Sequence, residues 1–231
     1  MADEVKALFS GWMSDELRAL PPDQQARVVR RVSLLERKGW SASVRSRDVV
    51  HLEDEIWELR VVGKGPAYRL LFFVVEGSVP RIVVLTGCVG KSVMKKPGLM
   101  ALEVARAERR RREWLFTGKG SMRGDRTTAE MVAELSRDPE FAAAWALSQP
   151  KIAVAVNVSR LREERGLTQA QLAEAVGRKQ PRIAEIERGD ANPTLETLTR
   201  IALALRVPLA ALFADAADAA VPARASARLA G

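Results

Sequence analysis

The chain has 231 residues, which is enough for one large domain or two modest ones. Hydrophobic residues make up 47% of it, so a packed core is expected and wholesale disorder is excluded. The net charge of +8 favours a polyanionic partner, and residues 1–115 hold most of the excess, with 21 Lys and Arg against 15 Asp and Glu.

The single cysteine and the single histidine narrow the possible chemistry. Cys88 has no partner for an intrachain disulfide, which suits a reducing compartment. With His51 as the only histidine, a clustered zinc or haem site is not expected, and we expect no cofactor. The longest strongly apolar run, 70–75, is too short to cross a bilayer, and the N-terminus lacks a signal-peptide pattern. We therefore expect a cytoplasmic protein without a membrane partner.

The first half alternates between helical and strand-like patterns. Helices are predicted over 14–20 and 22–38, the second opened by two prolines and stopped by a glycine. Three strand-like runs follow, joined by hairpin sequences, at 56–62, 67–76 and 81–87. A further helix is predicted over 98–114. This order predicts an α+β domain over 1–115, with a small antiparallel sheet covered by helices on one face.

The second half is predicted to be helical after a linker. Residues 116–128 are rich in glycine and charge without periodicity, which predicts a flexible linker. Helices are expected over 128–136, 139–147, 157–165, 194–205 and 208–213. These patterns predict a second domain over 129–213 with its core at 157–213. The Ala-rich tail, 214–231, is expected to be loose.

Two short helical patterns in this half, 169–176 and 180–188, are separated by Gly177. Thr168 is a suitable cap for the first, and glycine permits the sharp reversal between them. The pattern predicts a helix-turn-helix, in which the second helix enters the major groove of DNA.

The stretch resembles the XRE (Cro and lambda-repressor-like) family through Leu167-Thr168-Gln169, Leu172-Ala173, Gly177, Ile183, Ile186-Glu187-Arg188-Gly189 and Pro193. The resemblance implies an all-α, lambda-repressor-like domain that binds duplex operator DNA, as a homodimer. It places Gln169 on a phosphate and Gln180 on a base, while the ring of Pro181 cannot hydrogen-bond a base. Glu185 either accepts from cytosine or is an exposed acid. The implied DNA-binding set is Thr168, Gln169, Lys179, Gln180, Arg182, Glu185 and Arg188.

Motifs in the first half are similar to the phage-derived subgroup of the RelE/HigB-type toxin family. They are Trp57-Glu58-Leu59-Arg60, Tyr68-Arg69-Leu70, Val83-Val84-Leu85-Thr86-Gly87 and a lysine cluster. The resemblance implies a RelE-like fold and metal-independent, ribosome-dependent cleavage of mRNA by basic side chains. The implied catalytic set is Arg60, Arg69, Lys91, Lys95 and Lys96.

These cationic residues also have simpler interpretations. Arg60 and Arg69 project to the same sheet face if the strand register permits, where they are suited to clamp phosphate. Alternatively, each pairs across strands with Glu58, Glu76 or another acid. The three lysines either contact phosphate or form a solvated turn. Tyr68 alternates away from Arg69 and is predicted to pack in the core.

The leading hypothesis is a toxin–antitoxin fusion, because the lead-in residues 133–147 also look like those of antitoxins. Tethering raises the local concentration of the antitoxin half, so the toxin face is expected to be occluded. Residues 86–90 depart from the toxin pattern, which motivates a second hypothesis: a transcriptional regulator whose first half has lost catalysis and serves dimerisation or partner binding. A third is an adaptor for another protein or RNA.

Overall fold

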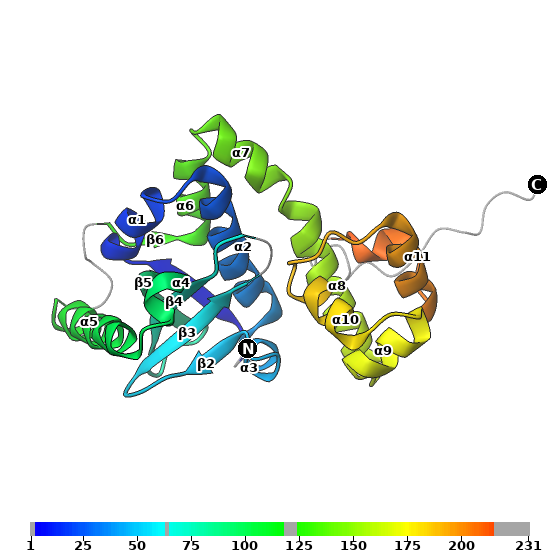
Figure 1. Ribbon diagram of the computed structural model, residues 1–231, viewed down its shortest axis with the longest axis horizontal. Helices are drawn as coiled ribbons and strands as arrows, with labels where there is room; N and C mark the ends of the chain where they lie inside the picture. The colour runs from blue at the N-terminus through cyan, green and yellow to red at the C-terminus, as the bar shows by residue number, and fades with distance from the viewer. Residues whose placement is uncertain (1–2, 63–64, 118–123, 215–231) are drawn as a thin grey trace, which may run out of the picture.

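The computed structural model describes residues 3–62, 65–117 and 124–214, which form two parts side by side (Figure 1). A sheet with helices on both faces makes up the N-terminal part, and a group of helices makes up the C-terminal part. Of the predicted loose tail, only Ala214 lies within the described residues. None of the helices described here is long and apolar enough to cross a membrane.

The sheet has six strands in the order β2-β3-β4-β5-β1-β6. The three predicted strand-like runs form its antiparallel centre as β3 (Ile56–Val61), β4 (Tyr68–Val75) and β5 (Arg81–Gly90). Three short strands went unpredicted: β1 (Val5–Phe9), β2 (Val49–His51) and β6 (Arg126–Thr127). Because β1 runs parallel to β5, the sheet is mixed, and the expectation of a purely antiparallel sheet is wrong. Strands this short carry too little periodicity to be recognised from sequence.

Helices cover both faces of the sheet rather than one. The helices of residues 11–116 are α1 (Gly11–Arg18), α2 (Pro22–Lys38), α3 (Trp40–Arg45), α4 (Lys91–Met94) and α5 (Pro97–Phe116). α2 buries Val28, Val32 and Leu35 in the main core. α5 packs Val104 and Trp114 on the opposite face. The apolar stripe of α5 is short, so the sequence did not indicate which face it would cover.

The expected linker over 116–128 is instead structured at both ends. Phe116 ends α5, and β6 pairs with β1 at the edge of the sheet, while residues 118–123 lie outside the described residues. Two helices follow, α6 (Thr128–Leu135) and α7 (Pro139–Ala146). Met131, Leu135 and Phe141 from these helices are buried in the core of the N-terminal part. The lead-in helices thus complete the N-terminal part.

The C-terminal part has its own core. It comprises α8 (Gln149–Glu164), α9 (Gln169–Val176), α10 (Gln180–Glu187), α11 (Leu195–Ala204) and the short 3-10 helix η1 (Leu209–Leu212). Leu172, Ile183 and Ile201 are fully buried at its centre. The arrangement agrees with the predicted all-α domain, except that α8 begins at Gln149 rather than at 157. The first half of α8 is buried against α2, a contact that its local sequence does not reveal.

α2 and α8 join the two parts. Leu34 of α2 packs with Ile152 of α8 in a small apolar cluster. Beside it, Arg31 donates to the carbonyl oxygens of Arg60 (2.7 Å) and Arg188 (2.9 Å) and pairs with Asp48. Buried charged groups are expensive unless they are paired and hydrogen-bonded, so these contacts specify one docking position for the C-terminal end of α10.

Candidate nucleic-acid interface

The helix-turn-helix forms where the sequence predicts it, for local reasons. The Thr168 hydroxyl accepts from the backbone N–H of Gln171, whose side chain in turn accepts from the Thr168 N–H, so α9 starts with a capping box. Gly177 ends α9 with a φ of 67°, in the left-handed region that glycine adopts without strain. α10 then begins at Gln180, and Lys179 provides no side-chain cap.

A buried ion pair underlies the two helices. Arg162 of α8 donates to both carboxylate oxygens of Glu187 at 2.6 and 3.0 Å, and Glu187 is 3% exposed. Burial lowers the pKa of Arg162, but the hydrogen bond and charge of Glu187 outweigh it and raise the pKa above its ordinary value. The guanidinium therefore stays charged, and the pair locks α8 to the C-terminal end of α10.

Hydrogen bonds through two glutamine amides connect this buried ion pair to the protein surface. Gln169 at the start of α9 donates to Glu187 at 2.9 Å, and Gln180 at the start of α10 donates to the oxygen of Gln169 at 2.8 Å. Gln180 is exposed, and its amide keeps its oxygen and a second N–H hydrogen for another partner. The structure thus brings the two glutamines together at one surface and orients both.

The remaining predicted DNA contacts lie along the same helix. Arg182 pairs with Glu185 at 2.9 Å and donates to the carbonyl oxygen of Asn192 at 3.3 Å. Arg188 pairs with Asp190 at 3.3 Å, and Lys179 is exposed. The Arg182–Glu185 pair is open to solvent, so Arg182 can exchange its acid for a phosphate at small cost, whereas Arg188 is held by the buried carboxylate of Asp190.

The two predicted catalytic arginines lie directly opposite each other. Arg60 of β3 pairs in register with Arg69 of β4, so both project to the same face of the sheet. Buried Glu58 of β3 lies between them, 2.7 Å from Arg60 Nε and 3.2 Å from Arg69 Nε. Burial lowers the pKa of Arg69, and the charge of Glu58 partly offsets that effect. The alternative of pairing with Glu58 is therefore what the structure shows, and it neutralises part of the cationic pair.

The C-terminal part does not cover these arginines. Leu59 and Val61 of β3 point into the core beneath α2, so Arg60 projects from the other face. α8 packs against α2, on the far side of that core. The expectation that tethering occludes the toxin-type face is therefore wrong for this arrangement of the two halves, because docking uses the helical layer and not the sheet face.

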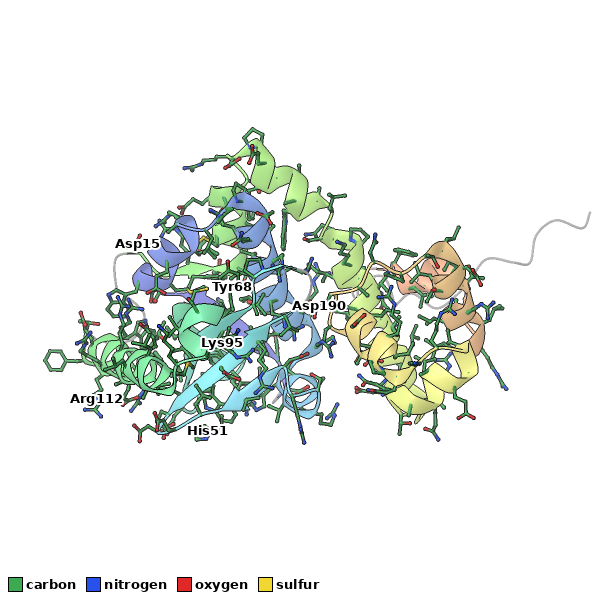
Figure 2. The ribbon with its side chains drawn as sticks, viewed as in Figure 1. Asp15, His51, Tyr68, Lys95, Arg112 and Asp190 are labelled. Carbon is green, nitrogen blue, oxygen red and sulfur yellow. The ribbon has the colours of Figure 1, made fainter. Side chains whose placement is uncertain are left out.

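The lysines follow β5, as the sequence indicates. Lys91 begins α4, and its side chain lies outside the described residues. Lys95 and Lys96 are exposed at the turn between α4 and α5, and Figure 2 draws Lys95 beside α4. In the described part of the chain neither side chain makes an ion pair, which matches the solvated-turn interpretation.

Some polar residues that shape the site could be assigned only from the structure. The sequence offered Glu58 as one of several possible partners of the two arginines, and the structure shows that it pairs with both. Arg31 and Lys38 of α2 hold the end of α10, Lys38 by donating to the Glu187 carbonyl oxygen. Arg110 of α5, within four consecutive arginines at 109–112, is largely buried and pairs with Glu16 at 2.8 Å. No group of three or more potential metal ligands occurs among the residues that can be described.

Comparison with known proteins agrees with the division into two parts. Residues 158–212 match a helix-turn-helix family, and residues 15–112 match the family "Phage derived protein Gp49-like". The chain is 44% identical over 54 residues to the HTH-type transcriptional regulator y4dJ of Sinorhizobium fredii, and covers 70% of that protein. The chain belongs to the HTH-type transcriptional regulators. This regulator carries its helix-turn-helix at the C-terminal end of a Gp49-like domain.

Two other regulators match a comparable stretch. Identity is 38% over 55 residues with SutR of Escherichia coli and 39% over 62 residues with the immunity repressor protein of Bacillus phage phi105. These matches take in 24% and 27% of the chain. The chain spans only 31% and 43% of the length of these two relatives. The matched lengths of 55 and 62 residues are close to that of the helix-turn-helix match at 158–212.

Proposed function

We propose that this regulator binds a specific operator duplex through α9 and α10, as a homodimer. The hydrogen-bonded series from buried Glu187 through Gln169 to exposed Gln180 carries the proposal. It holds the Gln180 amide in one orientation, with one acceptor and one donor free, and this pair matches the N6 and N7 edge of adenine. Because the ion pair with Arg162 holds Glu187, and with it the two glutamine side chains, little side-chain entropy is lost on binding DNA.

Basic residues on both sides of the Gln180 amide are placed to contact the phosphate backbone of the DNA. Lys179 precedes Gln180, and Arg182 and Arg188 follow it along α10. Phosphate contacts position a recognition helix, whereas base contacts give specificity. Two copies reading two half-sites one helical turn apart would give the operator its symmetry.

The test is selection of binding sites from a random duplex library with the full chain, followed by anisotropy titration. Gln180→Ala should weaken the selected site by about 1–3 kcal/mol, roughly 5- to 150-fold, and relax preference at one base pair. Arg182→Gln should weaken all sequences alike and reduce the salt slope by about 1. Gln149→Ala at the start of α8 is the matched control and should bind normally. Failure of the library to enrich any sequence would refute the proposal.

As a second candidate function, we infer that the N-terminal part is a RelE-like, metal-independent ribonuclease acting on mRNA at the ribosome, in a toxin–antitoxin fusion. The observation that favours it is the registered pair of Arg60 and Arg69 on one sheet face. Two guanidinium groups so placed can clamp one phosphate and stabilise charge in the transition state. The Glu58 carboxylate competes with a phosphate for both arginines, so it would reduce the activity of the pair.

This candidate is tested in the full chain, because Met131 and Phe141 complete the core of the N-terminal part and a fragment ending at 115 lacks them. Glu58→Gln should release the arginines and increase growth arrest and mRNA cleavage, and adding Arg69→Ala should abolish the gain. Circular dichroism checks that each variant folds. If neither wild type nor Glu58→Gln cleaves RNA with ribosomes present, the N-terminal part serves dimerisation or partner binding instead.

A further inference from the structure

A cleft of about 640 Å³ lies where the two parts meet. α2 forms one wall, and the end of α7, the start of α8 and the outer side of α10 form the other. Figure 2 shows Asp190, one of the lining residues, at this junction. The volume lies within the range of about 300–1,000 Å³ that holds small ligands. Arg182, Glu185 and Arg188 of the predicted DNA-binding set line it from the side of α10, whereas Arg27 and Lys151 belong neither to that set nor to the sheet face with Arg60 and Arg69.

The cleft carries more cations than acids. Five basic side chains line it against three acidic ones. Asp190 lies 3.9 Å from Arg30 and 3.3 Å from Arg188, and Glu185 pairs with Arg182. The third acid, Asp23, is exposed at the first turn of α2. Three of the five cations thus have acidic partners within the cleft.

Arg27 and Lys151 are the two basic residues of the cleft without an acidic partner in it. Neither forms an ion pair within the part of the chain that the structure describes, and they come from opposite walls, α2 and α8. Nη2 of Arg27 is buried without a hydrogen-bond partner among these residues. Buried charged donors are nearly always paired, so an orphaned one points to a missing acceptor.

The electrostatic environment of Lys151 agrees with an excess of positive charge. Burial lowers the pKa of Lys151, and the charge of Arg30 lowers it further. The charge of a bound anion would oppose this lowering of the Lys151 pKa, and the anion would supply the acceptor that Arg27 lacks. Arg binds phosphate, like carboxylate, with two parallel hydrogen bonds, and phosphate carries the greater negative charge to offset both cations.

The uncharged lining comprises Ser148, Asn192 and several apolar side chains, and the apolar ones offer a surface for a ring. Val62, Ala144 and Leu147 line the cleft, and Leu147 is 70% exposed. An exposed leucine beside unpartnered cations matches a ligand with a flat apolar portion and a charged end. We propose that this cleft binds a nucleotide, with its phosphates between Arg27 and Lys151 and its base against Leu147.

Because the ligand would contact both walls, it would hold the two parts together. A ligand that binds only the folded, docked chain raises its stability by mass action. This inference concerns a free nucleotide and does not rest on operator binding or RNA cleavage. A phosphate supplied by a DNA backbone is the other source of the same chemistry, and the experiment separates the two.

The test is calorimetric titration of the full chain with ADP, pyrophosphate, adenosine and a random duplex in separate runs. ADP should bind one to one and raise the melting temperature, pyrophosphate should bind more weakly, and adenosine should not bind detectably. The double variant Arg27→Gln/Lys151→Gln should weaken ADP binding at least tenfold. Arg112→Gln, an exposed arginine of α5, is the matched control and should leave ADP affinity unchanged.

Circular dichroism of the double variant establishes that it folds, and Leu147→Ser gives a second variant that removes no charge. Leu147→Ser should weaken ADP more than pyrophosphate. Equal ADP affinity in wild type and the double variant would overturn the proposal. The proposal would also be overturned if wild type did not bind ADP and the double variant lost binding of the duplex. That result would assign the two cations to DNA.

Discussion

Lys38 offers a quantitative test of the junction between the two parts. Its ammonium group is buried beneath the end of α10, where it donates to the carbonyl oxygen of Glu187. Burial lowers the pKa of Lys38 from 10.5 to about 8, although the charges of Asp48 and Glu187 partly offset the effect. The cost of burying this charge should therefore appear as a dependence of stability on pH.

The direction of the pH dependence of stability follows from the number of protons that the folded and the unfolded chain bind. Below pH 8, Lys38 is charged in the folded and the unfolded chain, so folding bears the full cost of its burial. As pH rises from 8 to 10.5, the folded chain holds fewer protons than the unfolded chain, so stability rises. At about 1.36 kcal/mol per pH unit between the two pKa values, Lys38 contributes about 3 kcal/mol over this window.

Lys38→Met removes the titrating group while keeping the length of the side chain. Its lost hydrogen bond adds a constant offset of about 1 kcal/mol. Urea unfolding followed by circular dichroism between pH 7 and 10.5 should show wild type gaining about 3 kcal/mol relative to the variant. Lys6→Met on β1, which replaces an exposed lysine, should show no such gain. A wild-type curve parallel to that of Lys38→Met across this range would show that Lys38 does not titrate with a lowered pKa in the folded chain.

Three further variants probe the core, the junction and Cys88. Arg162→Met should cost about 3–5 kcal/mol in urea unfolding, since it leaves Glu187 buried and unpaired, and a loss below 1 kcal/mol would contradict this. Leu34→Ala should cost about 2–5 kcal/mol and speed hydrogen exchange in α8; unchanged exchange would count against the docking. Burial raises the Cys88 pKa from 9.0 to about 12, so above pH 9 wild type should lose stability relative to Cys88→Ala; parallel pH profiles of the two proteins would contradict this.

Elements whose causes are local could be predicted from the amino-acid sequence. The Thr168 cap, the left-handed glycine at 177 and the apolar spacing of α9 and α10 all act within a few residues, so the helix-turn-helix was predicted nearly residue by residue. The long helix at Pro22–Lys38 was predicted for the same reason. The alternation along β3 and β4 likewise placed Arg60 and Arg69 on one face once the register was known.

Features that depend on contacts between residues distant in the chain emerged only from the folded arrangement. β1 pairs with β5 across more than 70 residues, a contact for which its five residues carry no signal. Glu58 becomes a restraint only because the register sets Arg69 opposite Arg60, and Arg27 meets Lys151 only because α2 docks on α8. Such contacts depend on loop closure and shared burial, which local periodicity does not encode. Composition showed that the first half is basic, but only the folded chain shows which of its basic residues have acidic partners and which do not.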